Sequence, residues 1–415
     1  MSSGRELAGT FQTPGNLAVM RELVTAASQH GTGIVATGSP LPPPEVPGDS
    51  HRVIISLSAL EPPFDHQVSD LIVTAGAGQS VDTLQDRLRM GGQRLAAEIP
   101  RGLGVTLGGA VAAGLDGFNA GLFGPLRDQV LGISYLDSLG RHAHCGGKVV
   151  KNVTGYDLSR LHVGAHGRFG LMYEITLKLR PLPDHEVTVV LARPTLSLAL
   201  KTGLALRSLG TKISGLVVAT GAVVAGSTVL GTDDSDHGPK EKFLLLRMEG
   251  HPQTLQRTCE ALAKRDANLE VLDTPSSDRL WSGLGHWPWQ EGFRVDFQLR
   301  PSQLEQAMAA LSGTKLDTKH SMIADIARGR LQLSEPSRVR GEGADQRLIE
   351  LGIPDLLHHF GATASLPNDP EDRPRRRDRF GQLPVAHRAL QNRLAEALDP
   401  SGIFAAGRRF EEAGA

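Results

Sequence analysis

Glycines recur throughout the stretch from Pro100 to Pro183 and carry the most informative chemical pattern in the chain. They include Gly102, Gly104, Gly108, Gly109, Gly114, Gly117, Gly121, Gly124, Gly146, Gly147, Gly155, Gly164, Gly167 and Gly170. Glycine costs conformational entropy on folding, so a folded chain keeps many of them where backbone turns sharply or approaches a partner closely. Successive amide N–H groups in turns form anion-binding concavities that Cβ atoms would block. A large flat cofactor held by main-chain amides would explain the pattern, and a turn-rich β structure is the alternative.

His142, His144 and Cys145 form a second group with potential chemistry. The two histidines are two residues apart on an expected strand and therefore share one of its faces. The sequence offers no third ligand at the usual spacing for zinc, which favours surface histidines over a metal site. Cys145 and Cys259 are the two cysteines of the chain. An iron–sulfur cluster needs about four, so we expect inert thiols here and any cluster in a partner protein.

Charged and aromatic groups leave several alternatives open. Arg127, Asp128, Lys148 and Lys151 can contact a phosphate or a substrate carboxylate, or they can form structural ion pairs. The basic run 373–379 fits a solvated loop or, less well, a partner-docking site.

The tryptophans Trp281, Trp287 and Trp289 cluster with His286 in one segment. Packing or subunit contact is the favoured interpretation of this cluster, and facing a flavin ring is the alternative.

The bulk composition limits the class of protein. A chain of 415 residues is too long to fold around a single hydrophobic core of ordinary size, so we expect two or three domains. Basic and acidic residues number 44 and 45, which argues against a nucleic-acid or anionic-membrane partner. The N-terminal stretch lacks the apolar core of a signal peptide, and no apolar run reaches membrane-spanning length. We expect a cytoplasmic protein, with peripheral attachment at the inner membrane through partners as an alternative.

Hydrophobic periodicity and turn residues outline the elements that must position these groups. We expect helices over residues 17–30, 80–90, 158–161, 196–209, 254–264, 303–311 and 385–398. We expect strands over residues 33–36, 53–57, 71–75, 130–136, 141–145, 171–179, 186–191, 215–220, 243–248 and 293–299. Strands 130–136 and 141–145 are predicted to form a hairpin, and Ser80 is a plausible helix N-cap.

The pattern of predicted elements changes at residues 181–184, which we take as the best domain boundary. After it, strands alternate with helices in a rhythm that suits a ferredoxin-like sandwich. We therefore expect domains at residues 1–184 and 185–380, with 381–415 as a helix and tail that return to the first domain. No internal repeat at a fixed period is evident in the sequence.

Two sets of motifs carry a family resemblance. Residues 106–110, Gly114, 127–128 and 130–132 resemble the flavin-binding domain of the vanillyl-alcohol oxidase/PCMH superfamily. The run KVVKNVTGYDL at 148–158 and the ending DPSGIF at 399–404 resemble the FAD-binding E subunit of bacterial glycolate oxidase. The resemblance covers most of residues 10–185 and the last 30 residues, and it is weak in the middle.

The resemblance implies an α+β fold. A PCMH-type FAD-binding domain of two subdomains would clasp FAD, and a ferredoxin-like α/β domain would cap the flavin. The cofactor-binding residues that it implies are Thr37, Gly38, Ser39, Gly76, Gly78, Gly104, Thr106, Gly108, Gly109, Gly114 and Gly170. The flavin would be non-covalent, because no histidine lies between His30 and His51, where many family members attach it.

The sequence departs from the family at two places. The phosphate loop reads Ala36-Thr37-Gly38-Ser39-Pro40 instead of a run of glycines, and Pro40 lacks a donor N–H. The tail 405–408 reads AAGR where the family usually has NPGR. Both departures favour an alternative, a subunit that keeps the fold for assembly and binds no flavin.

By resemblance, the function is that of an FAD-binding subunit of a glycolate (2-hydroxy acid) oxidase or dehydrogenase complex, active in glycolate catabolism and electron transfer. Its partners would be a catalytic flavoprotein subunit and an iron–sulfur subunit. The middle region has only isolated histidines, His251, His286 and His320, and lacks the histidine-rich stretch of the catalytic subunit. We therefore expect a subunit that does not oxidise substrate alone. A stand-alone flavin oxidoreductase is a further alternative.

Overall fold

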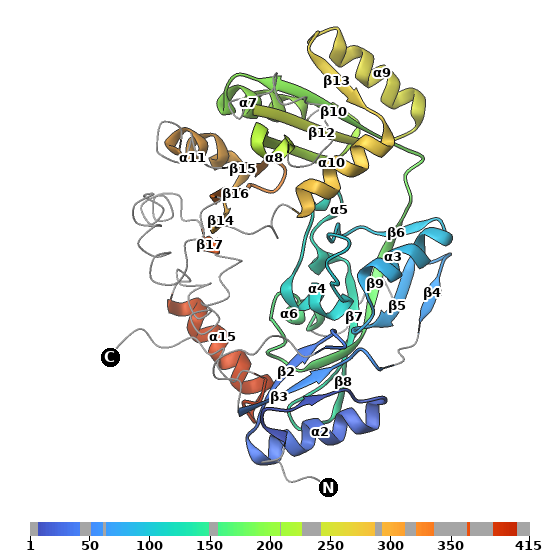
Figure 1. Ribbon diagram of the computed structural model, residues 1–415, viewed down its shortest axis with the longest axis vertical. Coiled ribbons are helices and arrows are strands. Elements are labelled where there is room, and N and C mark those ends of the chain that lie inside the picture. The colour runs from blue at the N-terminus through green and yellow to red at the C-terminus, as the bar shows by residue number, and fades with distance from the viewer. Residues whose placement is uncertain are drawn as a thin grey trace. The chain divides into compact units, whose positions relative to one another are not determined.

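The computed structural model divides the chain into two compact units, each with its own core (Figure 1). It describes residues 7–41, 51–60, 64–148, 157–207, 209–225, 242–286, 293–311, 321–335, 363–365 and 385–404. The first unit contains residues 1–116, 124–182 and 383–415, and the second contains 117–123 and 183–382. Residues 117–123 thus pack with the second unit, although the sequence assigns them to the first domain.

A small parallel sheet opens the first unit. Its strand order is β1 (Phe11–Gln12), β3 (Arg52–Ser56), β2 (Gly33–Thr37), and helix α2 (Leu17–His30) connects β1 to β2. Asn16 caps α2 by accepting from Val19 N at 3.0 Å, and Gly31 ends it at φ +66°. Met20, Val24 and Ala27 recur on one face of α2 and are fully buried. The expected bounds of this helix are confirmed.

An antiparallel sheet forms the rest of the first unit. Its order is β4 (Asp65–Gln67), β5 (Ile72–Gly76), β9 (Leu171–Pro181), β7 (Val130–Leu136), β8 (His142–Gly146), and β6 (Gln93–Leu95) pairs with the end of β9. Strands β7 and β8 make the predicted hairpin, in register from Gly132 opposite Gly146 to Leu136 opposite His142. Helix α3 (Val81–Met90) buries Val81, Leu84 and Leu88. Ser80 holds its N-cap position, but its side chain makes no capping hydrogen bond.

Helix α4 (Leu107–Ala113) was not expected from the sequence. Thr106 caps it by accepting from Gly109 N at 3.3 Å, and Gly114 ends it in the left-handed conformation at φ +64°. Two adjacent glycines lower the helix propensity of this segment and hide it from a propensity-based reading. Short elements follow: α5 (Ala120–Phe123), the 3-10 turn η2 (Leu126–Asp128) and α6 (Ser159–His162).

The second unit is built on an eight-stranded antiparallel sheet of order β13-β10-β12-β11-β15-β16-β14-β17. Its strands are β10 (His185–Arg193), β11 (Lys212–Thr220), β12 (Lys242–Gly250), β13 (Leu269–Leu272), β14 (Phe293–Gln298), β15 (Ser321–Asp325), β16 (Arg330–Glu335) and β17 (Thr363–Ser365). Its helices are α7 (Leu196–Leu206), α8 (Gly221–Ala225), α9 (Pro252–Ala263), α10 (Thr274–His286) and α11 (Leu304–Leu311), with the 3-10 turn η4 (Pro301–Gln303) before α11.

The sheet contains two halves with the same strand order. In β13-β10-β12-β11 the strands stand fourth, first, third and second along their half of the chain, which is the ferredoxin-like order. The other half repeats that order in β17-β14-β16-β15, and the halves join where β11 pairs with β15. The structure therefore contains an internal repeat that is not visible in the sequence.

Apolar residues alternate along the central strands of this sheet and build a core on each face. Leu216 and Val218 of β11 pack with residues of α7, α9 and α11, whereas Val217 and Ala219 pack with residues of α8 and α10. Helices α8 and α10 and strands β13, β15, β16 and β17 were not expected from the sequence. All the expected helices and strands are present.

The final described element returns to the first unit, within which helix α15 (Val385–Leu398) has the predicted bounds. Asp399 accepts from Ile403 N at 3.2 Å and Phe404 N at 2.8 Å, which fixes the turn after the helix. Ile403 O accepts from Ile34 N at 2.8 Å, and the side chains of Ile403 and Phe404 join the first core.

Candidate functional site

A cleft within the first unit is lined by segments that lie far apart in the sequence. It has about 590 Å³ of empty space, including open solvent at its mouth. The residues that line it are Ile34, Ala36, Thr37, Gly38, Leu57, Ala77, Thr106, Gly108, Gly109, Ala112, His166, Gly167, Gly170, Leu171, Met172 and Phe404.

The turn after β2 forms one wall of the cleft. Thr37 Oγ1 accepts from Ser39 N at 3.1 Å, and Ser56 Oγ donates to Ser39 O at 2.6 Å. A Cβ atom added at Gly38 would collide with the side chain of Thr106. Glycine is therefore required at this position, because the turn lies directly against the start of α4.

The start of α4 forms a second wall. Gly108 N donates to Ala77 O at 2.7 Å, and a Cβ at Gly108 would lie 2.9 Å from that oxygen. A Cβ at Gly109 would meet only Thr106 Oγ1, at 3.2 Å. The first glycine thus permits the packing of α4 against β5, and the second keeps the cleft surface clear of side chain.

The segment from Gly164 to Met172 forms the third wall and is docked on the end of α4. Gly164 N donates to Val111 O at 2.9 Å and His166 N to Ala112 O at 2.8 Å. Gly170 has a φ of +140°, and a Cβ there would lie 2.7 Å from Leu136 O. Close backbone contact therefore requires glycine at this position.

The chemistry of the cleft is that of a binding site. Among its described lining residues none is Lys, Arg, Asp or Glu. Polar side chains come from Thr37, Thr106 and His166, and the remainder is small or apolar. Such walls suit a large ligand with apolar parts that is held by backbone and hydroxyl groups, and any redox chemistry must come from a bound cofactor.

The structure brings six of the eleven sequence-predicted site residues to this cleft: Thr37, Gly38, Thr106, Gly108, Gly109 and Gly170. The other five, Ser39, Gly76, Gly78, Gly104 and Gly114, are absent from the described lining. Gly78 lies against the backbone of Leu57, and Gly114 ends α4, so close packing and helix termination account for these two glycines.

Sequence reasoning did not assign Ala112, His166, Leu171, Met172 or Phe404 to the cofactor site, although they line the cleft. Ala112 and the apolar residues carry no chemical signal. A usable signal was the run of residues 164–170, which has three glycines within seven positions. Its clustering with His166 marks a tight turn in which a large residue is unusual.

His142 and His144 are exposed on β8, as the surface interpretation predicts. His144 Nδ1 lies 3.0 Å from Ser134 Oγ, which also donates to Glu174 Oε1 at 3.0 Å. Cys145 is buried, and burial raises the pKa of its thiol to about 11, which fits an inert thiol. Within the described residues no cluster has the ligands for a metal ion.

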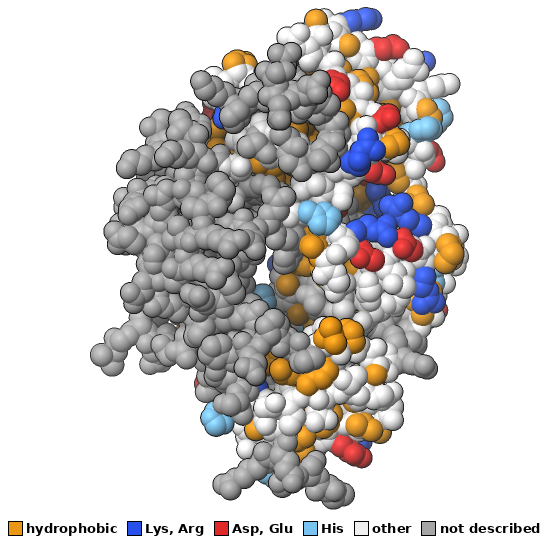
Figure 2. Space-filling model, viewed as in Figure 1, with side chains coloured by type: hydrophobic (Ala, Val, Ile, Leu, Met, Phe, Trp, Pro, Cys, Tyr) orange, Lys and Arg blue, Asp and Glu red, His pale blue; other side chains and the backbone are white. Residues whose placement is uncertain are grey.

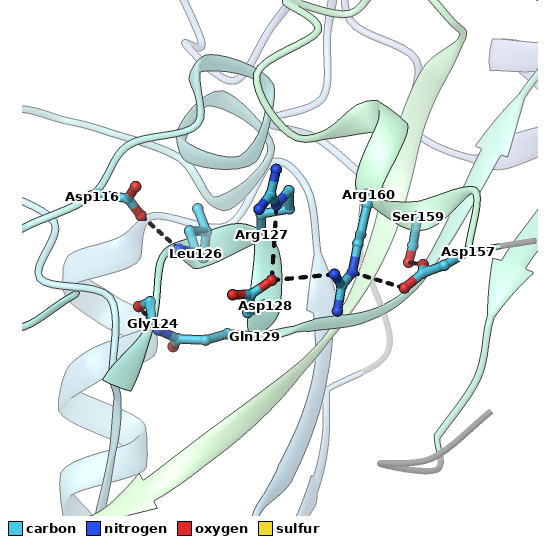
Figure 3. A network of polar contacts seen from close by, with 9 residues as sticks. All are labelled: Asp116, Gly124, Leu126, Arg127, Asp128, Gln129, Asp157, Ser159 and Arg160. Atoms are coloured by element: carbon cyan, nitrogen blue, oxygen red, sulfur yellow. Dashed lines mark hydrogen bonds and ion pairs between the residues drawn. The ribbon is translucent and has the colours of Figure 1, made fainter. Parts of the chain in front are cut away.

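The charged residues near the glycine block make ion pairs with one another. Arg160 bridges Asp128, with Nη1 to Oδ1 at 3.4 Å, and Asp157, with Nε to Oδ2 at 2.9 Å (Figure 3). Arg127 Nε lies 3.8 Å from Asp128 Oδ1. Lys148 Nζ donates to Asp65 at 2.7 Å, and this bond lowers the pKa of the Asp65 carboxyl. These contacts support the structural alternative for Arg127, Asp128 and Lys148, and Lys151 lies outside the described residues.

Trp281 is a core residue of the second unit. It is 2% exposed, packs edge-on against Phe118 at 5.4 Å and donates from Nε1 to Thr188 Oγ1 at 2.8 Å. Packing is therefore the role of this tryptophan. Trp287, Trp289 and the basic run 373–379 lie outside the described residues.

Basic and acidic side chains are interspersed on the face shown in Figure 2. That distribution agrees with the near-balanced composition. Among the described residues no helix is long and apolar enough to cross a bilayer.

The decisive comparison concerns the part of the chain that supplies most of the cleft. Residues 10–146 match the model of a family described as an FAD binding domain. This stretch is similar to that FAD binding domain. It includes every lining residue from Ile34 to Ala112, and the remaining lining residues come from 166–172 and from Phe404.

Curated relatives are similar to parts of the chain. "Glycolate oxidase subunit GlcE" of Escherichia coli (strain K12) is 42% identical over 120 residues, 29% of this chain and 34% of the relative. "D-2-hydroxyglutarate dehydrogenase" of Xanthomonas citri pv. viticola is 24% identical over 47% of this chain and 42% of the relative. "Glycolate oxidase subunit GlcD" of Bacillus subtilis (strain 168) is 28% identical over 43% and 38%. The chain thus spans less than half the length of these relatives.

Solved structures show the fold over almost the whole chain. p-Cresol methylhydroxylase superposes with a TM-score of 0.72 at 15% identity, covering 98% of this chain and 90% of that one. Alkyldihydroxyacetonephosphate synthase superposes with a TM-score of 0.67 at 13% identity, covering 95% and 76%. The expected α+β fold is confirmed, and the second unit has the expected ferredoxin-like strand order.

Proposed function

We propose that the cleft of the first unit binds FAD non-covalently and that the protein is the FAD-binding subunit of a glycolate (2-hydroxy acid) oxidase or dehydrogenase complex. The observation that carries the proposal is the coincidence of the FAD binding domain match with a cleft whose walls exclude Cβ atoms. The two relatives named as glycolate oxidase subunits supply the substrate class.

The residues of the cleft fit such a cofactor. Gly38, Gly108 and Gly170 bring backbone close together where a side chain would collide, and Gly109 leaves the cleft surface open. Thr37 and Thr106 offer hydroxyl groups, and Leu171, Met172 and Phe404 offer apolar surface that excludes water. When bound, FAD would supply the acceptor for the electrons released by oxidation of a C–OH group.

The remaining predicted residues, Ser39, Gly76, Gly78, Gly104 and Gly114, belong to this proposal as supports of the same walls. Ser39 fixes the turn that carries Thr37 and Gly38, and Gly114 ends the helix that carries Gly109. We assign them a positioning role, since they do not line the described cleft.

The complex would include a catalytic flavoprotein subunit and an iron–sulfur subunit. The chain has two cysteines, too few for a cluster, so an electron path through iron–sulfur centres requires a partner. We further propose that this subunit relays electrons and does not oxidise the 2-hydroxy acid alone. Oxidation needs a base for the hydroxyl proton and a cation for the carboxylate, and the described cleft has no Lys or Arg.

A flavin-free assembly subunit is the second candidate. The turn 36–40 favours it, because Pro40 has no N–H to offer a phosphate oxygen. A stand-alone flavin oxidoreductase would also bind FAD, but it would need no partner subunit for activity.

The test is to purify the chain alone, record its visible absorption spectrum and assay the supernatant after heating for FAD. Stoichiometric yellow flavin released by heat is the expected result. A folded protein that stays colourless after addition of FAD would establish the assembly role instead. Reduction of the bound flavin by glycolate only after the partner subunits are added would distinguish a relay subunit from a stand-alone enzyme.

A further inference from the structure

His166 has a backbone conformation that a large side chain seldom adopts. Among the described residues two non-glycines have a left-handed φ, Leu71 at +58° and His166 at +52°. The flanking left-handed positions Gly164 and Gly167, at +78° and +74°, are glycines. The chain thus keeps a bulky residue at the one position of this turn where glycine would relieve steric strain of about 1–2 kcal/mol.

The surroundings fix this conformation. His166 N donates to Ala112 O at 2.8 Å and Gly164 N donates to Val111 O at 2.9 Å, so the turn is attached to the end of α4. Arg168 N closes the turn by donating to Ala165 O at 3.2 Å. Strain of this kind persists where surrounding structure enforces it, and it concentrates at ligand sites.

The strained residue His166 also lines the cleft. His166 and Ala112, joined by that backbone hydrogen bond, both line the cleft. His166 is also the one described lining residue that carries a ring nitrogen able to donate or accept a hydrogen bond. Its neighbours in the lining, Gly167 and Gly170, have no side chain.

We propose that the imidazole of His166 is a direct FAD contact that contributes to cofactor affinity, and that the left-handed backbone is retained to place it at the cleft. This inference rests on the proposed function, because it presumes that FAD occupies the cleft. It adds a specific side-chain contact to walls that otherwise consist of backbone, hydroxyl and apolar groups.

Two variants separate the side chain from the strain. His166→Gly removes the ring and relieves the backbone, whereas His166→Ala removes the ring and keeps the strain. We expect both to weaken FAD binding by about tenfold, the loss of one good hydrogen bond. We expect the melting temperature of the FAD-free protein to be at or above the wild-type value in His166→Gly and not raised in His166→Ala.

Ala165→Gly is the matched control. It introduces the same backbone freedom one residue away, at a position outside the described cleft lining, and should leave FAD affinity unchanged. The measurements are the dissociation constant from flavin fluorescence in a titration with FAD, and the melting temperature of each variant without FAD.

The outcomes decide between distinct conclusions. If His166→Gly binds FAD with wild-type affinity, the proposed contact of the imidazole with FAD is wrong. It is also wrong if His166→Gly binds FAD more weakly while His166→Ala binds it as well as wild type does. Loss of affinity together with a lower melting temperature in His166→Gly would assign His166 a structural role and overturn it as well. A wild-type chain that takes up no FAD would refute the proposed function itself, whichever variant is studied.

Discussion

Single residues decide whether the cleft is open to a ligand. The glycines at 38, 108 and 170 are fixed by contacts within the protein, so substitution there disturbs the fold itself. Gly109 differs, because a Cβ added to it meets only one hydroxyl oxygen at 3.2 Å. It is therefore the glycine whose substitution can test binding without testing folding.

We predict that Gly109→Val lowers FAD affinity by at least tenfold while the chain stays folded, because two methyl groups would occupy the cleft surface. Ala113→Val is the matched control, since it places the same β-branched side chain at an exposed position of the same helix. Circular dichroism and an FAD titration of both variants make the comparison. Equal flavin content in Gly109→Val and wild type would show that the cofactor lies elsewhere.

His162 gives a prediction about pH. It is 4% exposed, with its ring 4.4 Å from that of Tyr135, and burial lowers its pKa to about 4. Above the ordinary pKa of about 6.5 the ring is neutral in both folded and unfolded chains. As pH falls from 6.5 to 4 only the unfolded chain takes up the proton, so stability is lost, by up to about 3 kcal/mol.

As pH falls from 6.5 to 4, we expect the free energy of unfolding to decrease less in His162→Phe than in wild type. Above pH 6.5 we expect the free energies of unfolding of the two proteins to depend on pH in a similar way. Urea unfolding of the two proteins at pH 7.5, 6, 5 and 4.5 measures the effect. Parallel stability curves for the two proteins would mean that this histidine is not kept neutral in the folded state.

At the scale of elements, hydrogen bonds within the turns that follow strands and helices place residues at the cleft. The turn after α15 is an example, since Asp399 is 1% exposed and its carboxylate accepts two backbone N–H groups. That turn brings Phe404 to the cleft, far from the other lining residues in sequence.

We predict that Asp399→Ala destabilises the first unit by about 1–3 kcal/mol, because buried N–H groups lose their acceptor, and that it also weakens FAD binding through displacement of Phe404. Asp399→Asn keeps an acceptor oxygen and should be milder in both respects. Chemical denaturation and an FAD titration are the measurements. An Ala variant that matches wild type in both would show that the turn does not depend on this carboxylate.

At the scale of the whole molecule, the lining of the cleft and the tryptophans belong to different units. All described lining residues lie in the first unit, whereas Trp281, Trp287 and Trp289 lie in the stretch assigned to the second. A ligand stabilises the part that binds it, by about 2.7 kcal/mol at a concentration 100 times the dissociation constant.

We therefore expect saturating FAD to raise the melting temperature of the first unit, followed by hydrogen exchange of the amides in β7 and β9, more than that of the second unit, followed by tryptophan emission. Parallel thermal scans with the two probes, with and without FAD, provide the measurement. Equal shifts in both probes would indicate that the two units unfold as one cooperative block.

Local sequence determined much of this protein. Periodic apolar residues and the caps Asn16 and Gly31 determined helix 17–30, and periodicity with the stop Asp399-Pro400 determined helix 385–398. The turn Asp137–Gly140 determined the hairpin between β7 and β8. The glycine-rich pattern indicated close backbone approach at Gly108, Gly109 and Gly170, and the family resemblance added Gly38. Such features depend on neighbours within a few residues, so the sequence alone carries them.

Tertiary structure decided the rest. It joined residues 34–38, 106–112, 166–172 and Phe404 into one cleft and paired β11 with β15 to unite two ferredoxin-like halves. It also buried Trp281 of α10 in a core of the second unit. It also showed that α4 forms despite its glycines, because Thr106 caps it and β5 supports it. Contacts between distant segments leave no local periodicity, and for that reason the strained position of His166 became apparent only in the folded chain.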